Sequence, residues 1–204
     1  MPVRVVLVFA SLALMLACHR STNPRISEPL TPAAPSAVAT GSAIGGASIV
    51  ARATPGRQDV LVNMQDACDP DTFNAALGPG TCVRSGGVQF SLFIAELTRL
   101  GFIGAWHFAP PTANVQVGQA FVAVNKGGET HTFTEVATFG GGIVPLLNQL
   151  AGIPTVAPEC AALEPDDFVA PDATYREAVD HAGALKFQCC IHPWMRLEAQ
   201  ASVR

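Results

Sequence analysis

The chain of 204 residues is long enough for one compact domain with appendages or for two small domains. Apolar residues make up 49% of it and charged residues only 14%, with 18 Gly and 16 Pro, a composition that suits a loop-rich globular protein. The net charge is -4, and the 12 Lys and Arg residues are scattered. Because phosphate neutralisation needs clustered basic residues, this pattern argues against a nucleic-acid partner.

Residues 1–18 have the organisation of an export signal. Arg4 supplies a positive charge, residues 5–16 an apolar core, and Leu16-Ala17-Cys18 an end with a small residue. That core is too short to span a bilayer, which takes about 20 residues. The end resembles a bacterial lipoprotein signal, in which Cys18 is lipidated, and simple cleavage is the alternative. Both routes predict an extracytoplasmic protein, periplasmic or in the cell envelope, in which disulfides can form.

Two segments are expected before the main domain. Residues 19–55 are rich in Ala, Pro, Ser, Thr and Gly, which favours a flexible tether, although an ordinary disordered N-terminus fits equally well. Residues 56–104 are expected to form a small helical subregion, with helices over 71–77 and 88–100. The second helix places four apolar residues on one face: Phe90, Phe93, Leu97 and Leu100. This stripe indicates core packing against one end or face of the sheet that follows.

From Trp106 the apolar pattern changes to the alternation typical of strands, and residues 105–204 are expected to form the main domain. The predicted strands cover 106–108, 114–117, 121–125, 130–136, 174–179, 184–189 and 197–203. Residues 138–172 are long, irregular and punctuated by Pro, which indicates an insertion with a short helix near 143–150. Because no repeated helical crossovers occur, the pattern favours an antiparallel sandwich over a parallel sheet.

Candidate metal ligands lie close together near the C-terminus, where Cys189, His192 and Met195 have the spacing Cys-x-x-His-x-x-Met. A site of two His and one Cys with a weak axial Met is the composition of a blue-copper electron-transfer centre. The second imidazole must come from elsewhere. His131, which follows a turn signal, is the main candidate, and His107 is its rival. A lone His in a strand is more often a satisfied surface or core residue, but the incomplete ligand set favours binding.

Six cysteines are present. If Cys18 carries lipid and Cys189 binds metal, four remain, and four cysteines allow three pairings. We favour Cys68 with Cys82, closing a short loop, and Cys160 with Cys190, tying the insertion to the metal loop. Cys189 rather than Cys190 is the expected ligand because it shares strand parity with Phe187, which we expect in the core. A disulfide or redox thiol between the two adjacent cysteines is the alternative.

The four candidate ligands, in this order on predicted strands, resemble the ligand set of the cupredoxins, the type 1 or blue copper proteins, with a short loop of the amicyanin or plastocyanin kind. The resemblance covers about 106–204. It implies a mainly β protein, an antiparallel Greek-key β-sandwich preceded by the small helical, disulfide-stapled subregion. It also implies one copper ion held by His131, Cys189 and His192, with Met195 as the long axial ligand. The chain departs from the family at Thr132, where many cupredoxins have an Asn that braces the two ligand loops.

The resemblance implies an exported one-electron carrier, not an enzyme, in which copper alternates between Cu(I) and Cu(II). Its redox partner protein cannot be named, and membrane contact is expected only through a lipid on Cys18. A copper-binding or copper-handling protein without a dedicated redox partner is the alternative, whereas a copper oxidase or nitrite reductase would need further histidine clusters. We expect Pro193 and Trp194 to cover the metal and the edge of His192 to be the exit for an electron.

Overall fold

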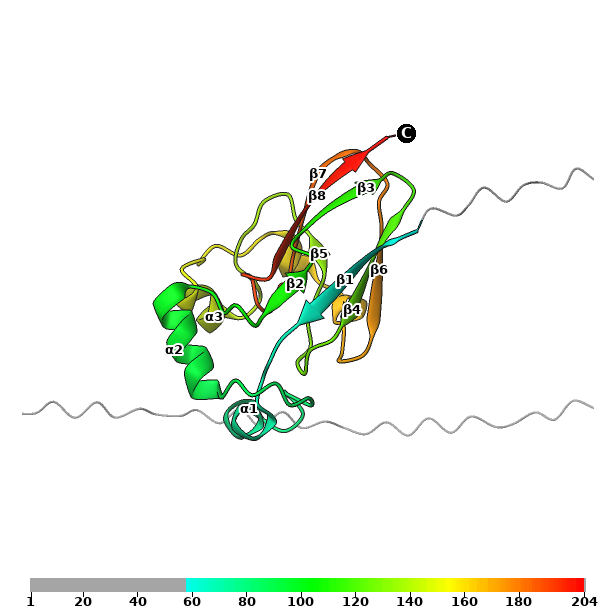
Figure 1. Cartoon of the computed structure of the whole chain (residues 1–204). Coiled ribbons are helices and arrows are strands. Elements are labelled where there is room, and N and C mark those ends of the chain that lie inside the picture. Colours follow the sequence, from blue (N-terminus) through cyan, green and yellow to red (C-terminus); the bar gives the residue numbers. More distant parts are fainter. Residues whose placement is uncertain (1–57, 204) are drawn as a thin grey trace, which may run out of the picture. The chain divides into compact units, whose positions relative to one another are not determined.

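The computed structural model of the protein describes residues 58–203. The expected leader at 1–18, with Cys18, and the expected tether at 19–55 lie outside the described residues. Within them, eight strands form two four-stranded sheets that share one core, and the helices α1, α2 and α3 gather at one end of this sandwich (Figure 1). No helix in this part of the chain is both long enough and apolar enough to cross a membrane.

The first sheet has the order β2-β1-β4-β6 and the second the order β3-β8-β7-β5. The strands of the first sheet are β1 (Val60–Gln65), β2 (His107–Ala109), β4 (Ala120–Asn125) and β6 (Thr174–Ala178). Those of the second are β3 (Thr112–Gln116), β5 (Thr134–Glu135), β7 (Gly183–Gln188) and β8 (Arg196–Ser202). The predicted mainly β sandwich is confirmed.

Strand direction differs from the prediction in each sheet. β1 pairs with β4 in parallel, and β3 pairs with β8 in parallel, so both sheets are mixed rather than purely antiparallel. The other pairs are antiparallel. Alternation along a strand shows which side chains face the core but carries no information on the direction of the neighbouring strand.

The segment 56–104, expected to be helical, contributes a strand to the sandwich. β1 lies between β2 and β4, and its side chains at Val62 and Met64 are buried in the core. The prediction is wrong here because the run from Val60 to Met64 is too short for its alternation to distinguish a strand from the neighbouring helical segments. Its β-branched residues and flanking Asp59 and Asp66 are the signal that could have revealed it.

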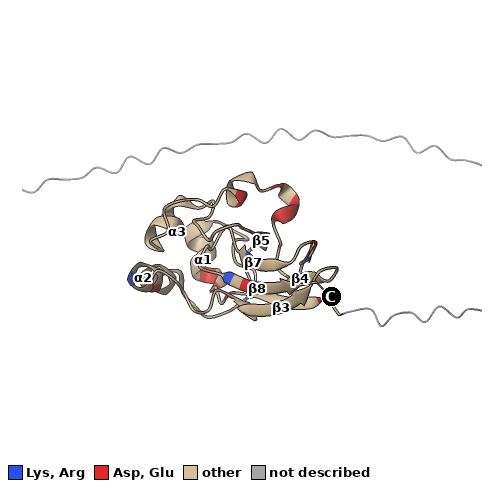
Figure 2. Cartoon of the chain, turned by 90° about the horizontal axis from the view of Figure 1, so that it is seen from above, with Lys and Arg blue, Asp and Glu red and all other residues tan. Residues whose placement is uncertain are grey.

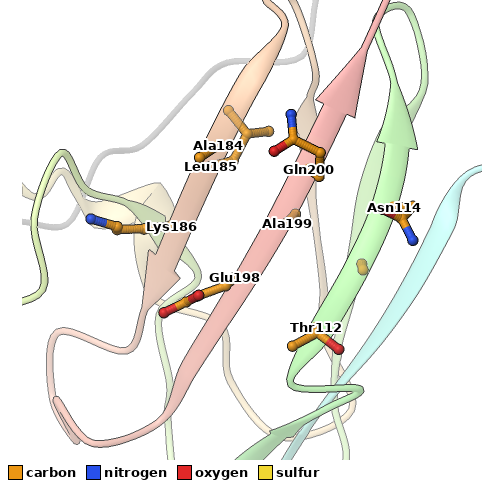
Figure 3. Close-up of a pocket in the computed structure, with 9 residues that line it drawn as sticks. Thr112, Asn114, Ala184, Leu185, Lys186, Glu198, Ala199 and Gln200 are labelled. Carbon is orange, nitrogen blue, oxygen red and sulfur yellow. The ribbon is translucent and has the colours of Figure 1, made fainter.

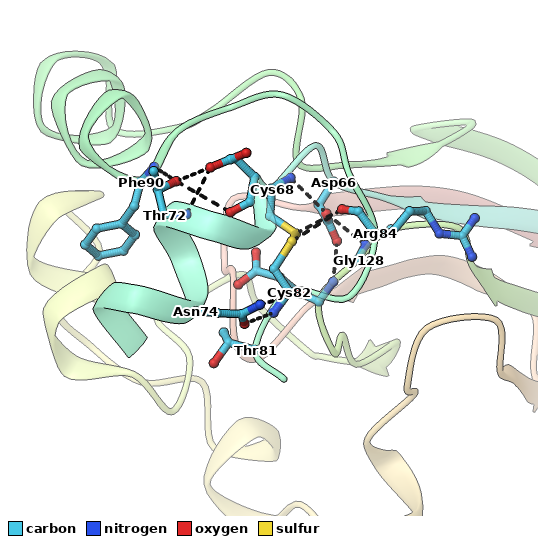
Figure 4. The surroundings of a disulfide bond; sticks show 12 residues. Asp66, Cys68, Thr72, Asn74, Thr81, Cys82, Arg84, Phe90 and Gly128 are labelled. Carbon is cyan, nitrogen blue, oxygen red and sulfur yellow. Dashed lines mark hydrogen bonds between the residues drawn. A yellow bond between two sulfur atoms is a disulfide. The ribbon is translucent and has the colours of Figure 1, made fainter. Parts of the chain in front are cut away.

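The two predicted helices of this segment are confirmed as α1 (Pro70–Leu77) and α2 (Phe90–Leu100). Asp69 caps α1 by accepting the backbone N–H of Thr72 at 3.0 Å, and Gly101 ends α2 in a left-handed conformation. The apolar stripe of α2 buries Phe93 and Leu97 in the core. The predicted disulfide Cys68–Cys82 is present beside α1 (Figure 4).

The insertion at 138–172 contains α3 (Pro145–Leu150) and two 3₁₀ turns, η1 (Glu159–Ala162) and η2 (Pro165–Asp167). The predicted disulfide Cys160–Cys190 ties η1 to the C-terminal loop. Figure 2 shows acidic residues on both 3₁₀ turns, where Glu159, Asp166 and Asp167 lie. The insertion is thus a long connection that the Cys160–Cys190 disulfide attaches to the loop after β7 of the second sheet, rather than a simple hairpin.

Aromatic rings fill the middle of the sandwich. Phe133 stacks on Phe187 with ring centroids 4.5 Å apart, and Phe121 packs against both at 5.9 and 4.9 Å. Full burial of a Phe side chain is worth about 1.5–3 kcal/mol. Because Phe133 and Phe187 each stand two residues from a candidate ligand, His131 and Cys189, the packed pair fixes the positions from which those ligands project.

Candidate metal centre

His131 and Cys189 leave the two sheets at the same end of the sandwich. His131 follows the turn after β4 and forms an isolated bridge with Val169, whose N–H donates to the carbonyl of His131 at 2.8 Å. Cys189 comes directly after β7. Its N–H donates to the carbonyl of Met195 at 3.0 Å, and the N–H of Met195 donates to the carbonyl of His192 at 2.9 Å. These bonds close the loop from Cys189 to Met195 into a tight turn.

The thiol of Cys189 lies between two imidazoles. Its Sγ is 3.8 Å from Nδ1 of His131 and 3.9 Å from Nδ1 of His192. All three residues are buried, and their ligand atoms lie within 4.8 Å of one another. Metal bonds to imidazole and thiolate are about 2.0–2.3 Å long, so one ion can reach these atoms. The donor set, two nitrogens and one soft sulfur, fits copper.

The surroundings of Cys189 favour the thiolate form of its side chain. Among residues 58–203 it is the cysteine outside a disulfide, whereas the adjacent Cys190 is bonded to Cys160. Burial raises the pKa of Cys189, but hydrogen bonding and charge from His131 and His192 outweigh burial and lower this pKa well below its usual value. The thiolate is the form that binds metals. Backbone N–H groups of Thr132 and His192 also point at Sγ, each at 3.4 Å.

Of the remaining histidines that the structure describes, neither joins this cluster. The rival candidate His107 is exposed on β2, and His181 lies on the surface beside Asp180. Met195 is fully buried in the same loop as Cys189 and His192, within the main apolar core. The structure therefore brings together three of the four predicted ligands and places Met195 beside them along the chain.

Thr132 joins the two ligand-bearing segments. Its hydroxyl oxygen accepts the backbone N–H of Cys190 at 2.8 Å, and the hydroxyl of Thr134 donates to the same oxygen at 3.0 Å. From the sequence alone, it was open whether Thr132 could join the two ligand loops as the Asn of many cupredoxins does. The threonine hydroxyl ties the segment after His131 to the segment after Cys189.

Asp66 and Glu129 are the residues at this site that the sequence did not reveal. Oδ2 of Asp66 lies 2.9 Å from Nε2 of His131, and Oε2 of Glu129 lies 3.5 Å from Nε2 of His192. Burial raises the pKa of Asp66, but hydrogen bonds from His131 and from the backbone of Gly128 and Glu129 outweigh it and lower this pKa to about 2. Burial raises the pKa of Glu129, and nearby His192 and Trp106 oppose that rise only in part.

The contact between Asp66 and His131 also changes the pKa of His131. Burial lowers the pKa of its imidazole, but hydrogen bonds to Asp66 and Cys189 outweigh burial and raise it to about 9. The imidazole of His131 therefore lies between the carboxylate of Asp66, which faces Nε2, and the sulfur of Cys189, which faces Nδ1. The only sequence signal for Asp66 was its place at the end of β1, a strand that was not predicted.

The imidazole of His192, whose edge we expect to be the exit for an electron, is buried. Only 3% of the residue is accessible, because α2 and two indole rings surround it. Ring centroids of Trp194, Trp106 and Phe93 lie 5.6, 6.4 and 6.5 Å from that of His192. An apolar cavity of about 260 Å³ between the helical segments reaches His192 and Glu129. The imidazole thus borders apolar side chains rather than open solvent.

A second hollow lies away from the candidate ligands. It crosses β3, β8 and β7, has a volume of about 430 Å³ and includes Lys186, Glu198 and Gln200 (Figure 3). Its lining contains no His or Cys, and none of the candidate ligands takes part in it. The chemistry-bearing side chains are therefore concentrated at the helical end of the sandwich.

No protein-family model and no curated protein matches this chain. Among solved structures, it is similar to the novel purple cupredoxin from Nitrosopumilus maritimus, at 12% identity over 71% of this chain and 100% of that one, with a TM-score of 0.40. It is also similar to the Cu(I) form of a mutant amicyanin, at 17% identity over 47% of this chain and 73% of that one, with a TM-score of 0.33. A third similar structure is oxidized plastocyanin from Dryopteris crassirhizoma, at 16% identity over 48% of this chain and 89% of that one, with a TM-score of 0.33.

Proposed function

We propose that the protein is an exported mononuclear type 1 copper protein that acts as a one-electron carrier. The observation that carries this proposal is the buried cluster in which the thiol of Cys189 faces Nδ1 of both His131 and His192. Copper bound there would supply the one-electron couple between Cu(I) and Cu(II). His131, Cys189 and His192 would be its strong ligands, and Met195 would supply a weak fourth ligand.

The surroundings of the cluster suit electron transfer. Two backbone N–H groups and the Thr132 link hold Cys189 and its loop in place through the protein's own hydrogen bonds, so little rearrangement is expected between the two oxidation states. Burial keeps water from the thiolate, which protects it from oxidation. The aromatic rings beside His192 separate the centre from the surface, and Trp194, which is only half-buried, offers the way out for an electron.

A copper-handling protein without a redox partner is the alternative. Such a protein needs an accessible site from which the metal exchanges readily. The three strong ligands here are buried, with His131 and Cys189 at 0% exposure, which favours the electron carrier. The partner would be a redox protein, and an extracytoplasmic location with an optional lipid on Cys18 remains part of the proposal.

The test is reconstitution of the full-length, metal-free protein with Cu(II), followed by absorption spectroscopy. We expect an intense thiolate-to-copper charge-transfer band that bleaches on mild reduction. Cys189→Ala should abolish the band because it removes the thiolate. A colourless product that does not respond to reductant would contradict the proposal.

The matched control is the double variant Cys160→Ala/Cys190→Ala, which removes the adjacent disulfide without leaving a stray thiol. It should keep the band, since neither sulfur faces the two imidazoles. Metal exchange with a chelator then separates the two functions. Slow exchange from the loaded protein supports the electron carrier, and release within the time of mixing supports copper handling.

A further inference from the structure

The outward-facing nitrogens of the two candidate ligand histidines both meet buried carboxylates. Because each Nδ1 faces Cys189, each Nε2 points away from it. Nε2 of His131 is 2.9 Å from Asp66, and Nε2 of His192 is 3.5 Å from Glu129. The side chains of Asp66 and Glu129 are only 1% and 7% exposed. Buried carboxylates are costly to keep without partners, so two of them behind one cluster call for an explanation.

Asp66 is held in a single orientation by the backbone around it. Its Oδ1 accepts the N–H of Gly128 at 2.9 Å and that of Cys68 at 3.2 Å, and its Oδ2 accepts the N–H of Glu129 at 3.0 Å. Figure 4 shows Asp66 and Gly128 beside the Cys68–Cys82 disulfide. A Cβ on Gly127 would lie 1.9 Å from Oδ2 of Asp66, so only glycine permits this approach.

Glu129 is oriented from the other side. Its Oε2 accepts the indole N–H of the fully buried Trp106 at 2.7 Å, and the same oxygen is the one that faces His192. Since the backbone N–H of Glu129 donates to Asp66, one connected set of hydrogen bonds joins Trp106, Glu129, Asp66 and His131, and Glu129 also faces His192. The contact to His192 is longer than that to His131, so Asp66 makes a hydrogen bond and Glu129 a weaker electrostatic contact.

We propose that Asp66 and Glu129 are positioning residues that turn Nδ1 of His131 and His192 toward the metal and tune its potential. This inference rests on the proposed copper function. A carboxylate that accepts Nε2–H fixes the tautomer and the ring orientation, and it makes the imidazole a stronger donor. Negative charge behind both ligands favours the more positive Cu(II) over Cu(I), which lowers the reduction potential of the centre.

The experiment compares neutral, nearly isosteric variants of the full-length copper-loaded protein, Asp66→Asn and Glu129→Gln. Loss of such a partner typically weakens metal affinity about 10- to 100-fold. If that loss falls on Cu(II), each tenfold raises the potential by about 59 mV for a one-electron couple. We expect a rise in both variants by redox titration, larger for Asp66→Asn because its contact is shorter. No rise in either variant would overturn the proposal.

The control is Asp59→Asn at the opposite end of β1. Asp59 also accepts a backbone N–H, that of Ala120 at 2.9 Å, and it pairs with Arg176 at 3.0 Å, so its loss changes the net charge equally. The potential should stay at the wild-type value. A rise in Asp59→Asn as large as in Asp66→Asn would assign the effect to overall charge and overturn the proposal.

A measurement without metal separates this inference from the proposed function. In the metal-free protein, proton NMR with ¹⁵N-labelled histidine should show a downfield, slowly exchanging Nε2–H signal from His131, which moves upfield in Asp66→Asn. Absence of that signal in the wild-type protein would overturn the positioning role even if the copper band is present. The signal together with a colourless copper product would contradict the proposed function alone. If Asp66→Asn does not fold, the reduction potential is measured instead in Glu129→Gln and in Trp106→Phe, which removes the indole N–H that donates to Glu129. A rise in the potential supports the proposal, and no rise in either variant overturns it.

Discussion

The interior of the sandwich has two parts with opposite chemistry. Its middle is a stack of phenylalanine rings, including Phe121, Phe133 and Phe187, which need no partners to be stable there. Its helical end buries ionisable and polar side chains: Asp66, Glu129, His131, Thr132 and His192. Each of these is paired, as buried polar groups must be. The middle stabilises the fold, whereas the helical end buries polar groups at a cost in stability and holds them in a defined cluster.

The aromatic middle and the polar helical end are connected along the chain. Phe133 and Phe187 are buried in the core, and each lies two residues along the chain from a buried candidate ligand, His131 or Cys189. The rings of this pair stack with only 8° between their planes. Movement of either ring would therefore shift a candidate ligand. The core acts as the foundation of the cluster as well as a source of stability.

The largest expected effect comes from the aromatic core. Phe187→Ala removes a fully buried ring and should lower the free energy of unfolding of the metal-free protein by about 3–5 kcal/mol, measured by urea denaturation. The control is Phe102→Ala, since Phe102 is 50% exposed and its loss should change this free energy by less than about 0.5 kcal/mol. Equal losses in the two variants would contradict the division of the interior described above.

The two disulfides offer a sharper comparison. Each pairs cysteines close in sequence, 14 residues apart for Cys68–Cys82 and 30 apart for Cys160–Cys190, so removal of either by double Ala substitution should cost about 2–4 kcal/mol on unfolding. Their effects on the copper potential should differ. Loss of Cys68–Cys82 loosens the backbone that holds Asp66 and should raise the potential more than loss of Cys160–Cys190. The reverse order in a redox titration would show that Asp66 is fixed by other contacts.

Local patterns in the sequence were sufficient for the candidate ligands. Cys189, His192 and Met195 lie within one loop, so their spacing alone places them together, and the turn before His131 points to the fourth. Both helices of the segment before the main domain were also predictable, because caps and apolar spacing are local properties. The two favoured disulfides are present, although four cysteines alone allow three pairings.

The groups behind the histidines could not be predicted in this way. Asp66 lies 65 positions from His131, and only the parallel pairing of β1 with β4 brings the two side chains together. Neither the strand nor its direction follows from alternation. In the same way, the stripe on α2 indicates burial but not that Phe93 packs beside His192. Contacts set by strand order and helix docking depend on the whole fold.

The smallest expected effect concerns the link between the ligand segments. Thr132→Val keeps the shape of the side chain but leaves the buried N–H of Cys190 without its acceptor, which should cost about 1–3 kcal/mol on unfolding of the metal-free protein. Thr134→Val is the matched control, because its hydroxyl only donates to Thr132 and lies nearer the surface, so its loss should cost less. An equal cost for the two variants in urea denaturation would mean that the Thr132 hydroxyl does not hold the segments together. A larger cost for Thr132→Val would show that the buried N–H of Cys190 needs the Thr132 hydroxyl as its acceptor, just as the buried charged groups nearby need their partners.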